Sequence, residues 1–430
     1  MNYIRRALGA LCAYSALTLL IVCIGLMLYV PGAGSTLLYA LLIAFVVSFV
    51  GTTAEPDHRR TPISYWYPLL AAAVWWVVAV GATQLHHGVW HASGLEKSIR
   101  ALCVIPVVYF FCKTPPLLMR HVQWGFMAVT LTGAWGLIFP KVVFMDGTNR
   151  PNTSEFGLYN TVGFANLVML FSVLTLASLH WRLTRFARTE AALKILVTLA
   201  GLYGVVQSQT RSSLVAIPVF LAIAFLANQR ANWRWRAWFA AGAVAILVVF
   251  AASDKVQDRV TLAHHEIEEC LASPSEDTSV CIRFQLLRAA SVMLKENPLF
   301  GVGDGHLFIA SMKDMGDRGI ISPYVAAAWG ETHNDLSFVA AAYGLFGLFA
   351  FMLLFYGVPA WFFVRHLRLS DQNARTAALM GLLVVMGFFA FGLTEAMYRS
   401  MRTVSVYIVL VGLLLALSRP QARTEIRPGS

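Results

Sequence analysis

The residues of this sequence that are best suited to chemistry are a histidine, His333, and three arginines, Arg211, Arg283 and Arg288. An imidazole ordinarily titrates at about pH 6.5, so its neutral form accepts a proton near neutral pH. A guanidinium stays protonated and binds two phosphate oxygens with its planar fork. These residue types favour proton transfer beside a phosphate-bearing substrate. The competing interpretations are structural, because a histidine also caps helices and an arginine also reaches lipid phosphates.

The residues on either side of this histidine extend the candidate site. Asn334 and Asp335 follow it, and both are also good N-cap residues for the helix expected next. Upstream, residues 281–296 have a helical pattern and the glycine-rich run 297–306 comes directly after them. That run lacks the preceding strand of a dinucleotide fingerprint and the Lys-Ser/Thr of a P-loop, so it does not predict a nucleotide site. We expect its glycines, Gly303 among them, to form tight turns near the substrate.

Metal-binding spacings are absent from the sequence. It contains no paired Cys-x-x-Cys, no His-Glu-x-x-His and no Asp-x-Asp. His86, His87 and His91 lie close together, but no Cys or carboxylate stands near them at ligand spacing, which favours solvated histidines. We therefore predict neither a metal nor an organic cofactor.

The composition is that of an integral membrane protein. Of the 430 residues, 58% are hydrophobic and 13% are charged, and the mean hydropathy is +0.65. These values exclude a cytosolic enzyme, a disordered chain and a single-pass receptor. The net charge of +11 does not indicate nucleic-acid binding, because the basic residues fall mainly between apolar runs, where they set topology.

Apolar runs of spanning length predict an all-α membrane protein with about twelve transmembrane helices. The positive-inside rule places both termini in the cytoplasm, because most basic residues of the short loops then share that side. The predicted spans are 8–29, 35–53, 65–85, 98–112, 122–140, 157–179, 193–210, 212–228, 237–252, 336–363, 377–395 and 402–418.

One polar segment, residues 253–335, interrupts the second half of the chain. It holds 13 of the 22 acidic residues and four of the 11 histidines, and the topology places it outside the cytoplasm. The predicted organisation is therefore spans one to nine in 1–252, this large loop with short helices and part of the active site, spans ten to twelve in 336–418, and a cytoplasmic tail, 419–430.

Two of the six cysteines, Cys270 and Cys281, lie in this loop, and the other four lie in predicted spans. In an oxidising compartment, a disulfide between them would restrain the turn from 271 to 280 and contribute about 3 kcal/mol in the chain-entropy account. We expect this bond in preference to two free thiols.

Three motifs occur in order between residues 200 and 350. Thr210-Arg-Ser-Ser-Leu214 comes first, then the run from Arg283 through Pro298-Leu-Phe-Gly-Val-Gly303, and then His333-Asn334 followed after nine residues by Gly344-Leu-Phe-Gly347. Together they resemble the signature region of the O-antigen ligase and polymerase superfamily, lipid-linked polysaccharide transferases of bacterial envelopes. The last motif is similar to the ligase pattern, whereas the spacing from Arg211 to Leu214 is close to, but not identical with, that of some ligases.

The resemblance implies an O-antigen ligase of the bacterial inner membrane. Such an enzyme moves a polysaccharide from undecaprenyl diphosphate to a hydroxyl of the lipid A-core oligosaccharide at the periplasmic face. We expect a metal-independent, inverting transfer in which His333 is the base and Arg211 and Arg283 hold the diphosphate. Arg283 and Arg288 lie about 140° apart around their predicted helix, so both cannot easily reach one substrate. The residues expected to contact substrate are Arg288, Asn334, Asp335 and Gly303.

Other functions remain open at this level. An O-antigen polymerase or a protein O-oligosaccharyltransferase would use the same lipid-linked donor with another acceptor. The ligase-type histidine motif and a loop of about 80 residues without an additional carboxyl-terminal domain favour the ligase. A polytopic lipid or glycan transporter would instead need charged or broken helices near mid-membrane, whereas the candidate residues gather at one face.

Overall fold

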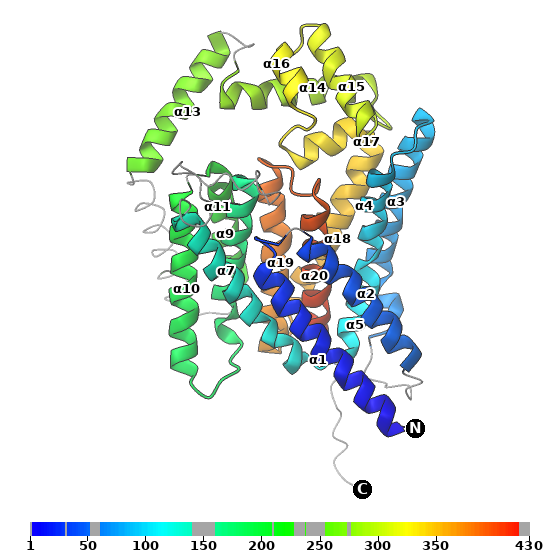
Figure 1. The fold of residues 1–430 in the computed structure, drawn as a ribbon, viewed down its shortest axis with the longest axis vertical. Coiled ribbons are helices and arrows are strands. Elements are labelled where there is room, and N and C mark those ends of the chain that lie inside the picture. The colour runs from blue at the N-terminus through cyan, green and yellow to red at the C-terminus, as the bar shows by residue number, and fades with distance from the viewer. Residues whose placement is uncertain are drawn as a thin grey trace.

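A computed structural model shows that the chain folds as a bundle of helices (Figure 1). The structure describes residues 2–30, 32–51, 61–139, 160–208, 210–227, 237, 254–272 and 277–420, and these ranges contain no β-strand. The helices of the first half are α1 (Asn2–Leu26), α2 (Ala33–Gly51), α3 (Tyr67–His87), α4 (Ala92–Leu102), α5 (Val104–Lys113), α6 (Pro116–Met119), α7 (Gln123–Ile138), α9 (Thr161–Ala177), α10 (Ala187–Gln207) and α11 (Arg211–Ala227).

The second half supplies both a layer outside the bundle and its central helices. Its helices are α13 (Asp254–Ala272), α14 (Ser279–Glu296), α15 (His306–Asp317), α16 (Pro323–Ala328), α17 (Asp335–Phe351), α18 (Val358–His366), α19 (Gln372–Gly392) and α20 (Met401–Ser418). A π-helical turn, Met352–Gly357, joins α17 to α18. α20 is buried along its length by α5, α2 and α19, so the carboxyl-terminal helix forms part of the core.

Six helical stretches of the described residues are long and apolar enough to cross a membrane, which supports an all-α membrane protein. A seventh is added if two helical segments that meet at 116°, Ala92–Lys113 and Pro116–Ile138, form one broken span. Shorter apolar helices occur in α1, α2 and α11. The six are Ile63–His87, Thr161–His180, Ala187–Gln207, Asp335–His366, Gln372–Gly392 and Met401–Ser418.

The number of twelve spans stays a prediction. The predicted ninth span, 237–252, lies outside the described residues except for residue 237. The predicted fourth span, 98–112, lies within the helical segment Ala92–Lys113, in which Cys103 stands between α4 and α5. Burial of α20, α19 and α9 explains their almost continuous apolar composition, since these helices face other helices on most sides.

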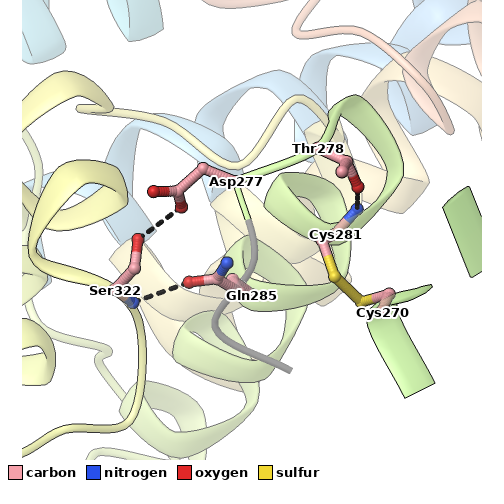
Figure 2. The surroundings of a disulfide bond; sticks show 6 residues. All are labelled: Cys270, Asp277, Thr278, Cys281, Gln285 and Ser322. Atoms are coloured by element: carbon pink, nitrogen blue, oxygen red, sulfur yellow. Dashed lines mark hydrogen bonds between the residues drawn. A yellow bond between two sulfur atoms is a disulfide. The ribbon is translucent and has the colours of Figure 1, made fainter. Parts of the chain in front are cut away.

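The polar segment after residue 253 forms a helical layer at one end of the bundle. Figure 1 shows α14, α15 and α16 at the end opposite to the amino terminus of α1. A disulfide joins Cys270 of α13 to Cys281 of α14, with the two Cα atoms 5.3 Å apart (Figure 2). In the same region Ser322 donates its hydroxyl to Asp277 and its backbone N–H to the side chain of Gln285, both at 2.6 Å. These contacts tie the start of α16 to the start of α14.

A backbone joint connects this layer to the membrane helix α17. At Gly344 the helix is interrupted, with φ 64° and ψ −168°, and the loop 298–303 packs into the break. The amides of Val302 and Gly303 donate to carbonyls of α17 at 2.9 Å, and the amide of Leu345 donates back to Pro298 at 2.8 Å. The two glycine-containing motifs of the sequence therefore bind each other.

The joint predicts that Gly344→Ala destabilises the fold strongly. A Cβ at this position would lie 2.3 Å from backbone atoms of Leu299, and its positive φ adds strain of about 1–3 kcal/mol. The expected result is a large loss of thermal stability and of monodisperse protein in detergent. Gly81→Ala in α3 is the matched control, because nothing lies within 4 Å of its Cβ. Equal melting temperatures for both variants would contradict the close packing at the joint.

Candidate active site

The candidate site begins at the junction between α16 and α17. Asn334 is the N-cap of α17, where its side chain accepts from the amide of Ser337 and donates to the carbonyl of Leu393, each at 2.9 Å. Asp335 is buried and accepts from the backbone amides of Met397 and Tyr398 at 3.1 Å. Both residues therefore attach the start of α17 to the turn between α19 and α20. These contacts give Asn334 and Asp335 a structural role that does not require a bound substrate.

His333 has an unusual backbone conformation. Its φ is 50°, and it is the non-glycine residue with positive φ among those that the structure describes. This region is uncommon for residues with a Cβ, and such strain is concentrated at functional sites. The imidazole is 15% exposed and packs edge-on against Trp329 with ring centroids 4.5 Å apart. The backbone and the tryptophan together fix the direction of the ring.

Two carboxylates lie on the Nδ1 side of this imidazole. Nδ1 is 3.4 Å from an oxygen of Glu395 and 3.7 Å from an oxygen of Glu331. The second oxygen of Glu331 pairs with Nη1 of Arg399 at 2.6 Å, and Asn160 donates to Glu395 at 3.0 Å. Carboxylates at Nδ1 favour the tautomer with a proton on that nitrogen, which leaves Nε2 to accept a proton. An imidazole in this arrangement can act as a general base through Nε2.

The environment of Glu395 favours its charged form. Burial raises the pKa of this carboxyl, but its contact with His333, the bond from Asn160 and the backbone amide of Ala396 together lower it below the ordinary value of 4.5. Glu395 is therefore an anion at neutral pH, and it can stabilise an imidazolium that forms when His333 takes up a proton.

The same three side chains could in principle hold a cation. One ligand atom from each of Glu331, His333 and Glu395 lies within 4.8 Å of the others. Two carboxylates and an imidazole are suitable ligands for a divalent transition metal. Arg399 already supplies a positive charge to Glu331, so the chain itself balances part of this negative charge. The sequence alone did not predict this grouping, because Glu331 and Glu395 are 64 residues apart, in loops that meet only after folding.

A cavity of about 320 Å³ opens beside the carboxylates, between the first turns of α9 and α20. Acidic and basic side chains share its wall, with Glu331 and Glu395 on the part that adjoins His333. Its described lining residues are Asn160, Gly163, Glu331, Glu395, Ala396, Met397, Arg399, Ser400, Arg402 and Thr403.

Arg211 begins α11, and its side chain lies outside the described part of the structure. The position of its helix is nevertheless defined by its neighbours. The hydroxyl of Ser212 is hydrogen-bonded to that of Thr394, and Ser213 donates to Asn166 at 2.8 Å. Because Thr394 precedes Glu395, the start of α11 lies next to the turn that carries this carboxylate.

The other predicted residues lie in the outer layer. Arg283 is half-buried and Arg288 is exposed on α14, and neither is among the described residues that line the cavity. Gly303 has φ 89° and uses its amide in the joint with α17. Its tight turn is as expected, but this amide is occupied by a protein carbonyl.

Glu395, Arg399 and Arg402 were not predicted as site residues from the sequence. All three lie in or next to the short turn between α19 and α20. A carboxylate and two arginines within eight residues, between two apolar stretches, were the signal available in the sequence. Their place near His333 depends on how α17 packs against this turn.

Comparison with known proteins gives one finding on the family. Residues 195–352 match the family model described as O-antigen ligase. The matched region includes α11 and α14 to α17, and therefore Arg211, Arg283 and His333, and it ends before Glu395. No curated protein matches the chain.

The contacts of Glu395 predict that Glu395→Gln lowers the stability of the fold in a pH-dependent way. Because folding lowers this pKa, the stability contributed by the anion is fully present above pH 4.5 and is lost as the pH falls through the lowered value. At pH 7 the variant should lose about 1–3 kcal/mol of unfolding free energy, since buried partners lose a charged acceptor.

The two melting curves should converge in acid below pH 4.5, as measured by thermal unfolding in detergent across the pH range. Glu268→Gln on the exposed face of α13 is the control and should match the unsubstituted protein throughout. A difference that persists unchanged in acid would contradict the buried anion.

Proposed function

Since the chain carries a domain of the O-antigen ligase superfamily in residues 195–352, we propose that it is an O-antigen ligase. In this proposal it transfers a glycan from undecaprenyl diphosphate to a hydroxyl of the lipid A-core oligosaccharide. The observation that supports the proposal most is the strained His333, whose Nδ1 faces two carboxylates beside a cavity. A membrane enzyme that deprotonates a sugar hydroxyl needs such an oriented base.

The proposed reaction is a single displacement. The acceptor hydroxyl gives its proton to Nε2 of His333 while its oxygen attacks the anomeric carbon of the donor. The bond from that carbon to the diphosphate oxygen breaks, and the electron pair leaves with the diphosphate. One displacement inverts the anomeric configuration, and the glycan becomes bonded to the acceptor. Glu395 balances the charge of the imidazolium during this step.

Arginines supply the charge that the leaving group needs. Outside the cytoplasm there is no nucleotide-sugar pool, so the donor must arrive already activated by its diphosphate. We assign Arg211 to the diphosphate because its helix starts beside the turn of Glu395. Arg283 is assigned to the same donor and Arg288 to a weaker substrate contact, through the resemblance of their motif. Guanidinium groups hold phosphate oxygens in two-point contacts that strengthen as charge develops.

The proposal includes an inner-membrane location with the segment 253–335 in the periplasm and both termini in the cytoplasm. The helical layer of α14 to α16 and the first residues of α1 occupy opposite ends of the bundle, as this topology requires (Figure 1). His333 and the carboxylates then lie at the periplasmic surface, where a lipid-linked donor and a lipid-anchored acceptor would meet.

The function is tested by reaction of the purified protein with a lipid-linked glycan and lipid A-core. A product in which the glycan is attached to lipid A-core supports the ligase. Growth of the polyprenyl-linked glycan alone would instead indicate a polymerase, and glycosylated protein would indicate a protein O-oligosaccharyltransferase. Translocation of the donor without any new bond would indicate a transporter.

The role of His333 predicts a large loss of transfer in His333→Asn. Asparagine tolerates positive φ and thus preserves the backbone, but it cannot act as the base. Single-turnover transfer should fall by about two to four orders of magnitude, while donor affinity and melting temperature stay close to those of the unsubstituted protein. His306→Asn, at an exposed position of α15, is the control. Near-normal transfer by His333→Asn would show that His333 is not the base and has only a structural role before α17.

The proposal of an arginine-assisted leaving group predicts no need for a metal. Exhaustive chelation should leave the transfer rate unchanged, because the positive charge comes from the chain. The acceptor is dispersed in detergent for this measurement, since chelators also disturb the packing of lipid A. If the rate falls and a divalent cation restores it, the group of Glu331, His333 and Glu395 is a metal site and the proposed mechanism is wrong.

A further inference from the structure

We infer that the cavity between α9 and α20 binds the diphosphate of the donor through Arg399 and Arg402. The inference rests on the proposed function and adds two binding residues to it. Both arginines line the cavity, although the turn that carries them lies beyond the region matched by the family.

The distribution of charge in the cavity favours an anionic group next to a base. Glu331 and Glu395 form the part of the wall that contacts His333, Arg399 pairs with Glu331, and Arg402 also lines the cavity. An anion placed among the carboxylates would be repelled, whereas beside the arginines it would be attracted. A sugar diphosphate bound there would therefore have its anomeric carbon near the carboxylate side.

Arg399 is suitably held for this contact. Its Nη1 is fixed by Glu331 at 2.6 Å, and the side chain is 39% exposed. The guanidinium has five N–H donors, so one contact with Glu331 leaves others for phosphate oxygens. Glu331 thus positions the arginine through Oε2, while its Oε1 lies 3.7 Å from Nδ1 of His333.

The start of α20 adds to the attraction. Ser400 is the N-cap of this 18-residue helix but makes no side-chain cap hydrogen bond. Ser400, Arg402 and Thr403 all line the cavity, so the first turn of the helix faces it. Backbone amides and the positive end of the helix dipole favour phosphate at such a position. Here they act together with two arginines in one cavity.

The size of the cavity limits what it can hold. Sites for small molecules range from about 300 to 1,000 Å³, and this cavity of about 320 Å³ lies at the lower limit. It accommodates a charged head group with the adjoining part of a sugar and excludes a whole lipid-linked glycan. The polyprenyl chain and the distal sugars must therefore extend out of it.

The test uses the full chain in nanodiscs of phosphatidylcholine, a lipid without net charge. Farnesyl diphosphate, farnesyl monophosphate, farnesol and inorganic diphosphate are titrated separately, and binding is measured calorimetrically. We expect farnesyl diphosphate to bind more tightly than the monophosphate, and farnesol to bind much more weakly. Comparable binding of inorganic diphosphate identifies the phosphate groups as the source of affinity. If farnesol binds as tightly as farnesyl diphosphate, the inference is overturned.

Substitutions of the two arginines then test whether farnesyl diphosphate binds in this cavity. Arg402→Gln and Arg399→Gln should each weaken farnesyl diphosphate binding by at least about tenfold. Arg402→Lys keeps the charge without the planar fork, so its affinity for farnesyl diphosphate should lie between those of the glutamine variants and the unsubstituted protein. This variant also tests the role of Arg402 if Arg402→Gln does not fold. Arg185→Gln, at an exposed position before α10 that does not line the cavity, is the control with the same change of charge.

The outcome separates this inference from the proposed function. If glycan transfer to lipid A-core occurs but folded Arg399 and Arg402 variants bind farnesyl diphosphate normally, the diphosphate binds elsewhere and the inference is wrong. If the variants lose binding but no acceptor ever receives a glycan, the diphosphate site stands and the proposed ligase reaction fails.

Discussion

The candidate site depends on one buried carboxylate at the start of α17. Asp335 is 2% exposed and accepts two backbone hydrogen bonds from the turn between α19 and α20. A carboxyl group at this depth needs hydrogen-bond donors in place of water, and the two backbone amides supply them. The bonds hold Met397 and Tyr398, and with them the rest of the turn, against the loop of His333. Glu395 reaches the imidazole, and Arg399 reaches Glu331, because Asp335 fixes this turn.

The charges of the site form a connected series. Asn160 donates to Glu395, whose oxygen faces His333, and Glu331 lies between His333 and Arg399. Each carboxylate thus has a positive or donating partner, which is the condition for burying several charges together. The series also fits the two halves of the proposed glycosyl transfer. The imidazole end is suited to the incoming hydroxyl, and the arginine end is suited to the departing diphosphate.

The sequence by itself determined the class of protein and indicated His333 as the candidate base. Apolar runs can be stable only when they are buried in lipid or in other helices, so composition alone required an all-α membrane protein. The disulfide between Cys270 and Cys281 was predictable because both cysteines lie in one polar segment, and the structure contains it. His333 was predictable because its type, its neighbours and the spacing to Gly344 belong to one local motif. All of these signals depend on residues that are near one another in the chain.

Only the tertiary structure decided which residues surround His333. Glu395 is 62 positions away, and nothing in the local pattern of the α19–α20 turn indicates that Asp335 binds it. The same holds for the glycine-rich run 297–306, which the sequence suggested as turns near the substrate but whose residues 298–303 join the break in α17 at Gly344. Periodicity and motifs describe each helix separately. The contacts between helices are set by packing, and by the need to satisfy buried polar groups wherever the chain brings them together.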